Sequence, residues 1–317
     1  MTKKIPWIYR VLFLTLLISC TGWVVHRYNF AALPNGGHLL GRVHELMHGE
    51  DSFRKSEQKP IIIGHRGVWI GLQQGGEGAG NTLRAIQEAI AIGVDWVEID
   101  VRRSDDGVLF LFHDKDVRRV TDAKCVFPAK DDWDFSSFKS DEIARLGINY
   151  KEGREAIPRL AEVLQRFSKD PRVNFVLDIK DPEIKPRELQ EAVGELDPKR
   201  LILFGRKDCL RCFARKENKS KETTLYTLGY TALWTENNNK FDYLFSHEFF
   251  LRKCKELGCE YLVLPALFLN QRLIDEAHEA GLKVLAYGID EQNPTKVTDM
   301  GVDGLIVDDP SGVISKY

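Results

Sequence analysis

Apolar and polar residues follow one repeating pattern through residues 59–317. Short β-branched apolar runs alternate with segments in which apolar residues recur at helical spacing. This alternation is typical of parallel strands joined by helices. It predicts an α/β fold, a (β/α)8 TIM-type barrel. The predicted strands are Ile61–Gly64, Trp96–Val101, Val108–Phe112, Phe175–Ile179, Leu201–Phe204, Thr224–Thr227, Tyr261–Leu264, Val284–Tyr287 and Gly304–Val307.

Three predicted helices have clear apolar stripes: Thr82–Ile92, Leu160–Phe167 and Gln271–Ala280. Asn81 is the predicted N-cap of the first, because a short polar side chain can accept a hydrogen bond from the first helical turn. Gly281 is predicted to close the last, since glycine tolerates the left-handed backbone found at helix ends.

The apolar runs number one more than a closed eight-stranded barrel needs. Asp105–Gly107 is a hairpin-turn signal, so Val108–Phe112 is predicted to fold back on Trp96–Val101 as an extra hairpin strand. Residues 122–156 and 230–258 are too long for simple connections. We expect them to be inserted loops over the barrel mouth, where insertions usually shape a substrate site.

The barrel is preceded by an N-terminal hydrophobic segment, Val11–Cys20, which follows basic residues as in an export signal. It ends in Leu17–Cys20, which resembles a bacterial lipobox, so Cys20 is either lipidated after cleavage or part of an uncleaved transmembrane anchor. Residues 1–25 are therefore predicted to be a signal peptide or membrane anchor, and residues 26–58 a linker. Either alternative predicts an exported, membrane-associated protein on the periplasmic or extracytoplasmic face.

The charge of the chain argues against a nucleic-acid partner. Its 317 residues include 45 basic and 47 acidic side chains, for a net charge of −2. Nucleic-acid-binding domains normally carry a basic excess or patch, and neither is evident here.

The cysteines leave two alternatives open. Cys209 and Cys212 have the spacing of a zinc site, but they fall in a predicted helix without the tight turns of such sites. An exported protein could instead form one or two disulfides. The other alternative is unpaired, buried thiols.

Polar side chains cluster at the ends of three predicted strands. His65 and Arg66 follow the first strand, Glu98 and Asp100 lie on the second, and His113 follows the extra strand. Because the carboxyl ends of barrel strands meet at one mouth, these side chains are predicted to converge there.

Glu98 and Asp100 are two residues apart on a strand and therefore share a face. Asp178, on a later strand, supplies a third carboxylate. Oxygen ligands of this kind suit one hard divalent cation, Ca²⁺ or Mg²⁺. The alternative is that the carboxylates form salt bridges with neighbouring cationic side chains, Arg102, Arg103 or Lys180.

His65 and His113 suit general acid–base chemistry near neutral pH, one taking a proton from a nucleophile and the other protonating a leaving alkoxide. Arg66 suits an anionic substrate, since guanidinium binds phosphate oxygens in pairs. Its alternative is a structural pair with Glu98 or Asp100. Lys180 lies on the face of Asp178 and is a second candidate for phosphate binding.

These residues, in this order, resemble the glycerophosphodiester phosphodiesterase family of phospholipase-C-like TIM barrels. The resemblance covers about residues 60 to 312, and the ordered set is more specific than any single motif. Its motifs are His65-Arg66-Gly67, Asn81-Thr82, Glu98-Ile99-Asp100-Val101, Asp106-Gly107, His113-Asp114, Ile157-Pro158-Arg159-Leu160, Asp178-Ile179-Lys180, Gly301-Val302-Asp303-Gly304-Leu305-Ile306 and Asp308-Asp309-Pro310.

The resemblance implies a barrel that hydrolyses glycerophosphodiesters to glycerol 3-phosphate and an alcohol. It implies one divalent cation at Glu98, Asp100 and Asp178. It also implies an acid–base pair formed by His65 and His113, with Arg66 on the phosphate. In the mechanism usually proposed for the family, the glycerol hydroxyl of the substrate attacks phosphorus, and water then opens the cyclic phosphate.

Three positions depart from the family pattern. Gly80 stands where the family usually has Glu before Asn-Thr, and Glu77 in the preceding glycine-rich loop is a candidate substitute. Asp178 replaces a longer Glu, which could alter the affinity for or choice of metal. Tyr287 aligns with a frequent Trp near the eighth strand, which could change how the substrate stacks.

Two other functions remain open at this stage. One is a lysophospholipase D that acts on membrane-derived lysolipids, with aromatic residues of 230–258 contacting an acyl chain; the alternative is that these residues simply pack on the barrel. The other is a non-catalytic, ligand-binding barrel, given the Gly80 departure.

Overall fold

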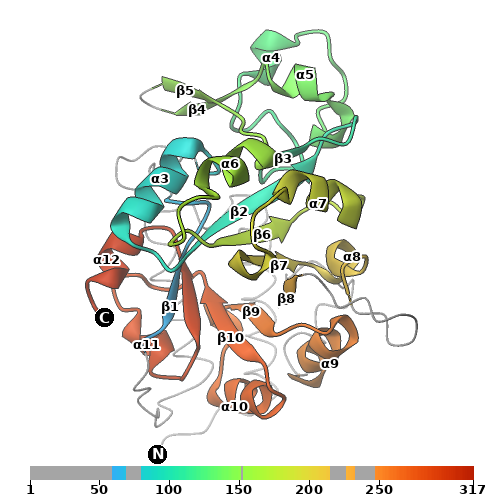
Figure 1. The fold of residues 1–317 in the computed structure, drawn as a ribbon. Coiled ribbons are helices and arrows are strands. Elements are labelled where there is room, and N and C mark those ends of the chain that lie inside the picture. The colour runs from blue at the N-terminus through green and yellow to red at the C-terminus, as the bar shows by residue number, and fades with distance from the viewer. Residues whose placement is uncertain (1–58, 69–79, 151–152, 215–225, 233–246) are drawn as a thin grey trace, which may run out of the picture.

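A closed barrel of parallel strands forms the centre of the molecule (Figure 1). The computed structural model describes residues 59–68, 80–150, 153–214, 226–232 and 247–317. The barrel closes because β1 pairs with both β11 and β2, so the predicted TIM-type fold is confirmed. Its strands are β1 (Ile61–Gly64), β2 (Trp96–Arg103), β6 (Phe175–Ile179), β7 (Leu201–Gly205), β8 (Thr227–Thr231), β9 (Tyr261–Pro265), β10 (Lys283–Tyr287) and β11 (Gly304–Val307).

The predicted extra hairpin strand is also present. β3 (Leu109–Leu111) runs antiparallel to the end of β2, with Val101 opposite Leu111. The turn between them contains Gly107 at φ +88°, a left-handed conformation that glycine adopts without steric cost.

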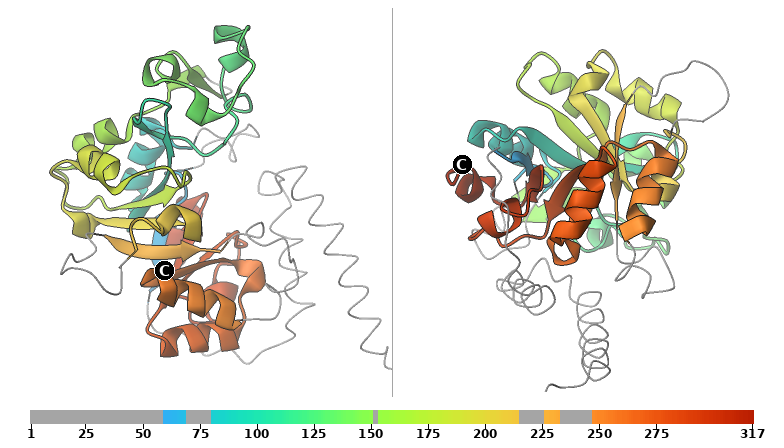
Figure 2. Two further views of the ribbon diagram at one scale, coloured as in Figure 1. Left: turned by 90° about the vertical axis from the view of Figure 1, so that its right-hand side faces the viewer. Right: turned by 90° about the horizontal axis from the view of Figure 1, so that it is seen from below.

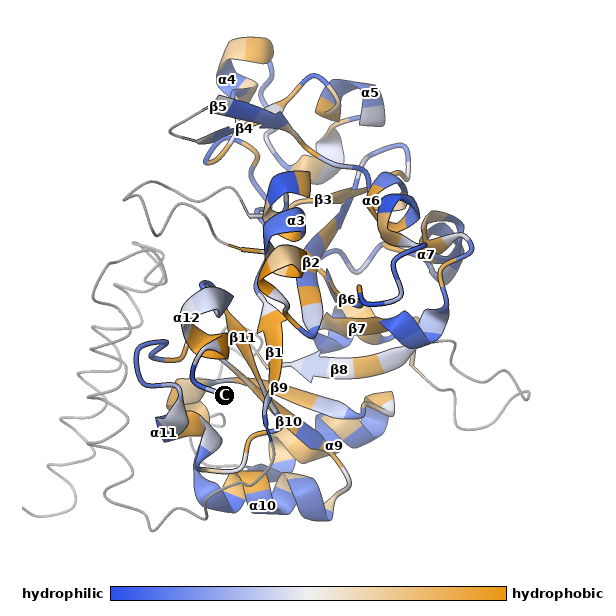
Figure 3. Cartoon of the chain, turned by 60° about the vertical axis from the view of Figure 1, so that its left-hand side comes forward, coloured by the Kyte–Doolittle hydropathy of each residue, from blue (hydrophilic) through white to orange (hydrophobic). Residues whose placement is uncertain are grey.

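Helices surround the barrel, with apolar residues toward the strands and polar residues outward (Figure 3). The helical segments packed around the barrel are α3 (Leu83–Ile92), α6 (Leu160–Phe167), α7 (Pro186–Val193), α8 (Lys207–Leu210), α9 (His247–Leu257), α10 (Gln271–Glu279), α11 (Thr295–Thr298) and α12 (Pro310–Ile314), with short 3₁₀ turns at Pro198–Arg200 and Ala266–Phe268. Gly281, at φ +75°, follows the end of α10 as expected.

The barrel interior is filled by side chains rather than hollow. These inward-facing residues form a cluster separate from the larger one between strands and helices. Such filling leaves the strand ends as the place where polar side chains can gather. The buried residues of the interior cluster are Ile63, Val176, Ile202, Phe204, Tyr261, Val263, Leu285 and Ile306.

The prediction that Asn81 caps α3 is wrong. The cap is Thr82, whose side chain accepts a hydrogen bond from the backbone N–H of Ala85. Asn81 instead has a left-handed backbone, φ +62°, and turns its amide toward Asp100 on β2. Its side chain is therefore used by the candidate site and not by the helix.

The sixth predicted strand was placed too early, at Thr224–Thr227, whereas β8 spans Thr227–Thr231. The true strand contains Gly229, which weakens the apolar pattern. A Cβ at Gly229 would lie 2.5 Å from the Phe204 ring, so packing on the neighbouring strand requires glycine here.

Residues 113–150 and 153–159 form a subdomain that projects from the end of β2 (Figures 1 and 2). This agrees with the predicted insertion at 122–156, although its antiparallel hairpin was not predicted. The subdomain has its own apolar core around Phe135 and Phe138. Its elements are α4 (Ala123–Val126), a 3₁₀ turn (Phe135–Ser137), α5 (Ser140–Ile143), β4 (Gly147–Tyr150) and β5 (Gly153–Ala156).

The two ends of the second predicted insertion, 230–258, belong to the barrel and its helices. Its first residues complete β8, and residues 247–257 form α9, which packs on the barrel. Phe250 is buried in the main core, and Phe249 packs against that core. Residues 233–246, which include Trp234, lie outside the described residues.

Several N-terminal predictions also fall outside the described residues: the segment 1–25, the linker 26–58 and Glu77. Within the ranges that the structure does describe, no helix is both long and apolar enough to cross a membrane. The five cysteines in those ranges form no disulfide, and the alternative of unpaired, buried thiols holds for Cys209, Cys254 and Cys259, whereas Cys125 and Cys212 are exposed.

Candidate active site

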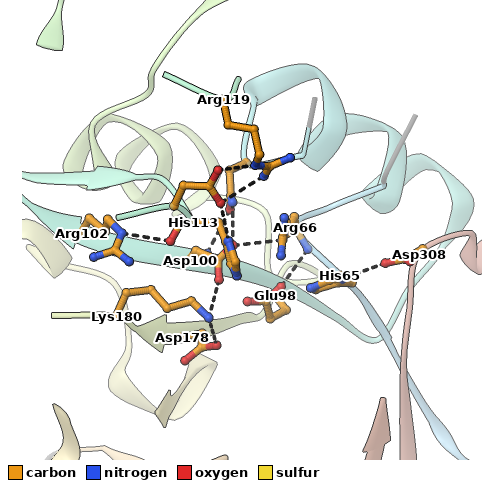
Figure 4. A network of polar contacts seen from close by, with 12 residues as sticks. His65, Arg66, Glu98, Asp100, Arg102, His113, Arg119, Asp178, Lys180 and Asp308 are labelled. Atoms are coloured by element: carbon orange, nitrogen blue, oxygen red, sulfur yellow. Dashed lines mark hydrogen bonds and ion pairs between the residues drawn. The ribbon is translucent and has the colours of Figure 1, made fainter. Parts of the chain in front are cut away.

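Three carboxylates come together where β2 and β6 lie side by side (Figure 4). Asp100 is directly opposite Asp178 in the strand register, and Glu98 lies on the same face of β2. One oxygen from each carboxylate lies within 4.8 Å of the others. Glu98 and Asp100 are nearly fully buried, at 3% and 1% exposed.

This donor set fits a hard divalent cation. All three candidate ligand atoms are carboxylate oxygens, which Ca²⁺ and Mg²⁺ prefer. Among the described residues, the buried Oδ1 of Asp100 accepts no well-oriented hydrogen bond. The Lys180 ammonium lies 2.9 Å from this oxygen without being aligned as a hydrogen-bond donor, so the oxygen keeps the capacity to bind a metal cation.

Lys180 lies within the carboxylate cluster. Its ammonium is 2.9 Å from Asp100 Oδ1 and 2.5 Å from Asp178 Oδ2. The salt-bridge alternative therefore applies to Lys180. It does not apply to the two neighbouring arginines, which pair elsewhere: Arg102 with Asp181 at 2.6 Å and Arg103 with Glu188 at 3.0 Å.

The two buried carboxyls of β2 respond differently to this environment. Burial, and then the nearby charge of Asp100, raises the pKa of Glu98 to about 7. Burial also acts to raise the pKa of Asp100, but Lys180 and the other surrounding cationic groups outweigh it and hold that pKa well below its ordinary value. The site therefore concentrates negative charge on Asp100.

Arg66 contacts both carboxylates of β2. Its backbone N–H donates to Glu98 Oε2 at 2.8 Å, and its Nε lies 3.1 Å from Asp100 Oδ2. Arg66 has φ +56°, and a Cβ at Gly80 would come within 2.6 Å of the Arg66 Cβ. Glycine at position 80 therefore leaves the space that Arg66 occupies.

Asn81 is a site residue that the sequence analysis assigned to a helix cap. Its Nδ2 donates to Asp100 Oδ2 at 2.7 Å, and its Oδ1 accepts from the Asp100 backbone N–H at 2.9 Å. The two bonds fix the orientation of the Asp100 carboxylate. Its place within the Asn-Thr motif was the available signal, because Thr82 can serve as the cap by itself.

His113 lies just beyond β3 and is held by its own sequence neighbourhood. Its Nδ1 is 2.8 Å from Asp114 Oδ1, and its carbonyl accepts from Arg102 Nε at 2.9 Å. Arg119 pairs with the same Asp114 carboxylate. Although 38% of the side chain is exposed, desolvation and the charge of Arg66 lower the pKa of His113 to about 4.

His65 lies at the carboxyl end of β1. Its Nδ1 is 2.5 Å from Asp308 Oδ1, in a pair that the sequence analysis did not identify. Burial lowers the pKa of His65, but the charge of Asp308 and the hydrogen bond to it raise that pKa above the ordinary value overall. The pairing could have been predicted from the position of Asp308, directly after the strand that closes the barrel onto β1.

Comparison with known proteins gives a consistent family. A sequence profile described as "Glycerophosphoryl diester phosphodiesterase family" matches residues 65–311. A glycerophosphodiester phosphodiesterase of Caldanaerobacter subterraneus subsp. tengcongensis is 26% identical over 272 residues, spanning 81% of this chain and 97% of that protein.

Solved structures share the fold. A phosphodiesterase of Oleispira antarctica, solved with the product sn-glycerol-3-phosphate, superposes with a TM-score of 0.61 at 23% identity, covering 81% of this chain and 96% of that one. A glycerophosphodiester phosphodiesterase of Thermotoga maritima gives 0.59 at 22% identity, covering 83% and 100%.

Proposed function

The chain belongs to the glycerophosphoryl diester phosphodiesterase family, and from this membership we propose that it hydrolyses glycerophosphodiesters to glycerol 3-phosphate and an alcohol. The observation that carries the proposal is the carboxylate cluster of Glu98, Asp100 and Asp178 at the barrel mouth, accompanied by two carboxylate-paired histidines. Cations and imidazoles gathered at one buried cluster of acidic groups suit the cleavage of an anionic ester.

We assign one divalent cation, Ca²⁺ or Mg²⁺, to the carboxylate cluster. Glu98, Asp100 and Asp178 would hold it, and Asn81 would orient Asp100 through its two hydrogen bonds. When bound, such a cation neutralises charge on the phosphate and on the oxygens that gain charge during the reaction.

The different environments of the two histidines support distinct roles in the first step. His113, with a pKa of about 4, is neutral near pH 7 and suits the general base that takes the proton from the glycerol hydroxyl. His65, whose pKa is raised, suits the general acid that protonates the departing alkoxide. In the second step the roles reverse, because His65 then accepts the proton of the water that opens the cyclic phosphate.

Arg66 and Lys180 are proposed to bind the substrate phosphate. Both are cationic, and both lie against the carboxylates that would hold the cation. A cation at the cluster would take over part of their role as counter-charges, which leaves them to bind phosphate oxygens. Arg66 suits this role because guanidinium can bind two oxygens at once.

The test is release of glycerol 3-phosphate from glycerophosphocholine by the purified protein. We expect activity that EDTA abolishes and that Ca²⁺ or Mg²⁺ restores. Asp178→Asn should lose the activity, whereas Asp197→Asn, an exposed carboxylate before β7, should keep it. If EDTA-treated protein stayed active, the cation would have to be removed from the proposal.

The other two functions are outcomes of the same assay. Activity on lysophosphatidylcholine alone would identify a lysophospholipase D, and metal binding without turnover of either substrate would identify a binding protein. The described residues do not favour the lysolipid alternative, since Phe250 is buried in the main core.

We also propose that the protein is exported and held at the membrane by its N-terminal segment. The support is the basic N-terminus followed by Val11–Cys20. Cell fractionation and labelling with a radioactive fatty acid would separate the alternatives. A lipoprotein would lose label and membrane association in Cys20→Ala, whereas a transmembrane anchor would keep its membrane association. Recovery of the unlabelled wild type in the cytosol would contradict both.

A further inference from the structure

The seam where the barrel closes brings a second carboxylate to the site. β11 lies next to β1, with Val307 opposite Gly64. The chain leaves both strands at this point, so His65 and Asp308 become neighbours. The His65 backbone N–H donates to the Val307 carbonyl at 2.8 Å, which sets the two backbones in register. Asp308 Oδ1 then lies 2.5 Å from His65 Nδ1.

Asp308 is itself held by a third strand end. Glu291, in the loop after β10, accepts the backbone N–H of Asp308 through Oε1 at 2.5 Å and that of Asp309 through Oε2 at 3.0 Å. This two-point contact fixes the start of the loop that carries Asp308. A chain of contacts therefore runs from Glu291 through Asp308 to His65. Its members follow three neighbouring strands of the barrel, β10, β11 and β1.

We propose that Asp308 is the positioning residue of His65, and that Glu291 positions Asp308. A carboxylate on Nδ1 holds that nitrogen in its protonated form and fixes the plane of the ring, which assigns proton transfer to Nε2. Arg66 and Glu98 also act on the charge of His65, and Asp308 is the carboxylate that lies 2.5 Å from its Nδ1.

The inference rests on the proposed hydrolysis for its chemical consequence. The imidazolium of His65 gives its Nε2 proton to the alkoxide oxygen as the bond from that oxygen to phosphorus breaks. The ring is then neutral, with its Nδ1–H still bonded to Asp308. It regains the proton from the water that attacks the cyclic phosphate, so the proton balance closes over the two steps.

The kinetic experiment compares two substrates. Asp308→Asn should lower kcat for glycerophosphocholine by about 10- to 100-fold, the usual loss when a residue that orients a reacting group is removed. KM should stay within about twofold, because substrate binding is unchanged. With a p-nitrophenyl ester of glycerol 3-phosphate as the substrate, the kcat of Asp308→Asn should fall much less, since that leaving group departs without a proton.

Two further variants separate positioning from folding. Asp309→Asn removes the neighbouring carboxylate while keeping a good N-cap for α12, and it should behave as the wild type. Glu291→Gln should lower kcat in the same direction as Asp308→Asn but by less. If Asp308→Asn fails to fold, Asp308→Glu serves instead. It keeps the carboxylate and should retain the hydrogen bond to His65 Nδ1.

A nuclear magnetic resonance readout does not depend on activity. In protein with ¹⁵N-labelled histidine, assigned with His65→Gln, the His65 Nδ1–H signal should lie far downfield in the wild type and in Asp309→Asn, and should vanish in Asp308→Asn. An unchanged signal in Asp308→Asn, or an unchanged kcat, overturns the inference. A wild type that hydrolyses no diester but shows the signal instead contradicts the proposed function and leaves the His65–Asp308 pair standing.

Discussion

The regions around His65 and His113 each place a carboxylate beside a histidine ring, but they take that carboxylate from different parts of the chain. Each histidine has a carboxylate at Nδ1. For His113 the partner is the next residue, Asp114, at the start of the subdomain. For His65 the partner is Asp308, 243 residues away in the sequence. One pair is local, and the other forms only when the barrel closes.

The difference between the two regions extends to charge. Asp114 is shared with Arg119, so its negative charge is partly neutralised before it acts on His113. Arg66 adds a further positive charge that lowers the pKa of His113. Asp308 faces its histidine at the shorter distance of 2.5 Å, and the pKa of His65 rises. Two similar pairs can thus shift the pKa values of the two imidazoles in opposite directions, downward for His113 and upward for His65.

The strongest way to break this comparison is to remove each imidazole and vary the leaving group. His65→Ala and His113→Ala should each lower kcat for glycerophosphocholine by about 10²- to 10⁴-fold, the usual share of a general acid or base. The p-nitrophenyl ester of glycerol 3-phosphate should restore much of the rate to His65→Ala only. Steady-state kinetics on both substrates measures this.

An equal response of both variants to the better leaving group would show that the two histidines do not have separate roles. Metal binding by His113→Ala, measured by calorimetry, should match the wild type. That control establishes that the carboxylate cluster is intact.

The carboxylate cluster lies beside both histidine regions, and we expect its metal affinity to depend on its own carboxylates and not on the two imidazoles. Asp178→Ala removes one of three proposed ligands, and we expect the affinity for Ca²⁺ or Mg²⁺ to fall at least about 10-fold, the lower bound for losing even an outer-shell partner. Titration calorimetry measures the affinity, with Asp197→Asn as control. Unchanged affinity would remove Asp178 from the site.

Arg119 allows the charge difference to be tested directly. Arg119→Gln frees Asp114 to act on His113 alone, so the pKa of His113 should rise from about 4 toward its ordinary value, by up to about one unit. The general base would then be protonated at a higher pH than in the wild type. Titration of the His113 ring protons by nuclear magnetic resonance in EDTA-treated protein measures the shift. A fall in the pKa would contradict the argument.

The smallest expected effect tests whether Thr82 caps α3 while Asn81 orients Asp100. Thr82→Ala removes the cap of α3 and should lower the free energy of unfolding by about 1 kcal/mol, without changing metal affinity. Asn81→Ala should do the reverse and weaken metal binding through Asp100. Urea unfolding and calorimetry separate the two. Equal losses of stability in both variants would mean that Asn81 also supports the helix.

Much of the fold followed from sequence because strand runs such as Leu201–Gly205 are continuous, uncharged and short. The pattern failed where packing required an exception. Gly229 interrupts the apolar run of β8 because the ring of Phe204 occupies the space beside it. The hairpin of β4 and β5 was missed because both strands are short and β5 is largely exposed, without an apolar run.

The candidate site was also predictable where the local sequence pattern marks a residue, and not where tertiary packing decides its role. Glu98, Asp100 and Asp178 were identifiable because the residues directly before and after each of them on its strand are apolar. Asn81 was misassigned because Asn is a common helix cap, and only the tertiary fold shows its amide on Asp100. Asp308 was missed because periodicity along the chain does not show which strands meet; its pairing with His65 could be predicted only by combining its position with the closed-barrel topology.

The closing seam has a consequence for when the protein can act. His65 follows β1, the first strand of the barrel, whereas Asp308 follows β11, the last one. A chain still being synthesised, or threaded unfolded through a membrane, has its first imidazole but not the partner that orients it. The protein thus becomes active only once the final strand has joined the barrel. A shortened product that lacks β11 would be inactive even if every proposed metal ligand were present.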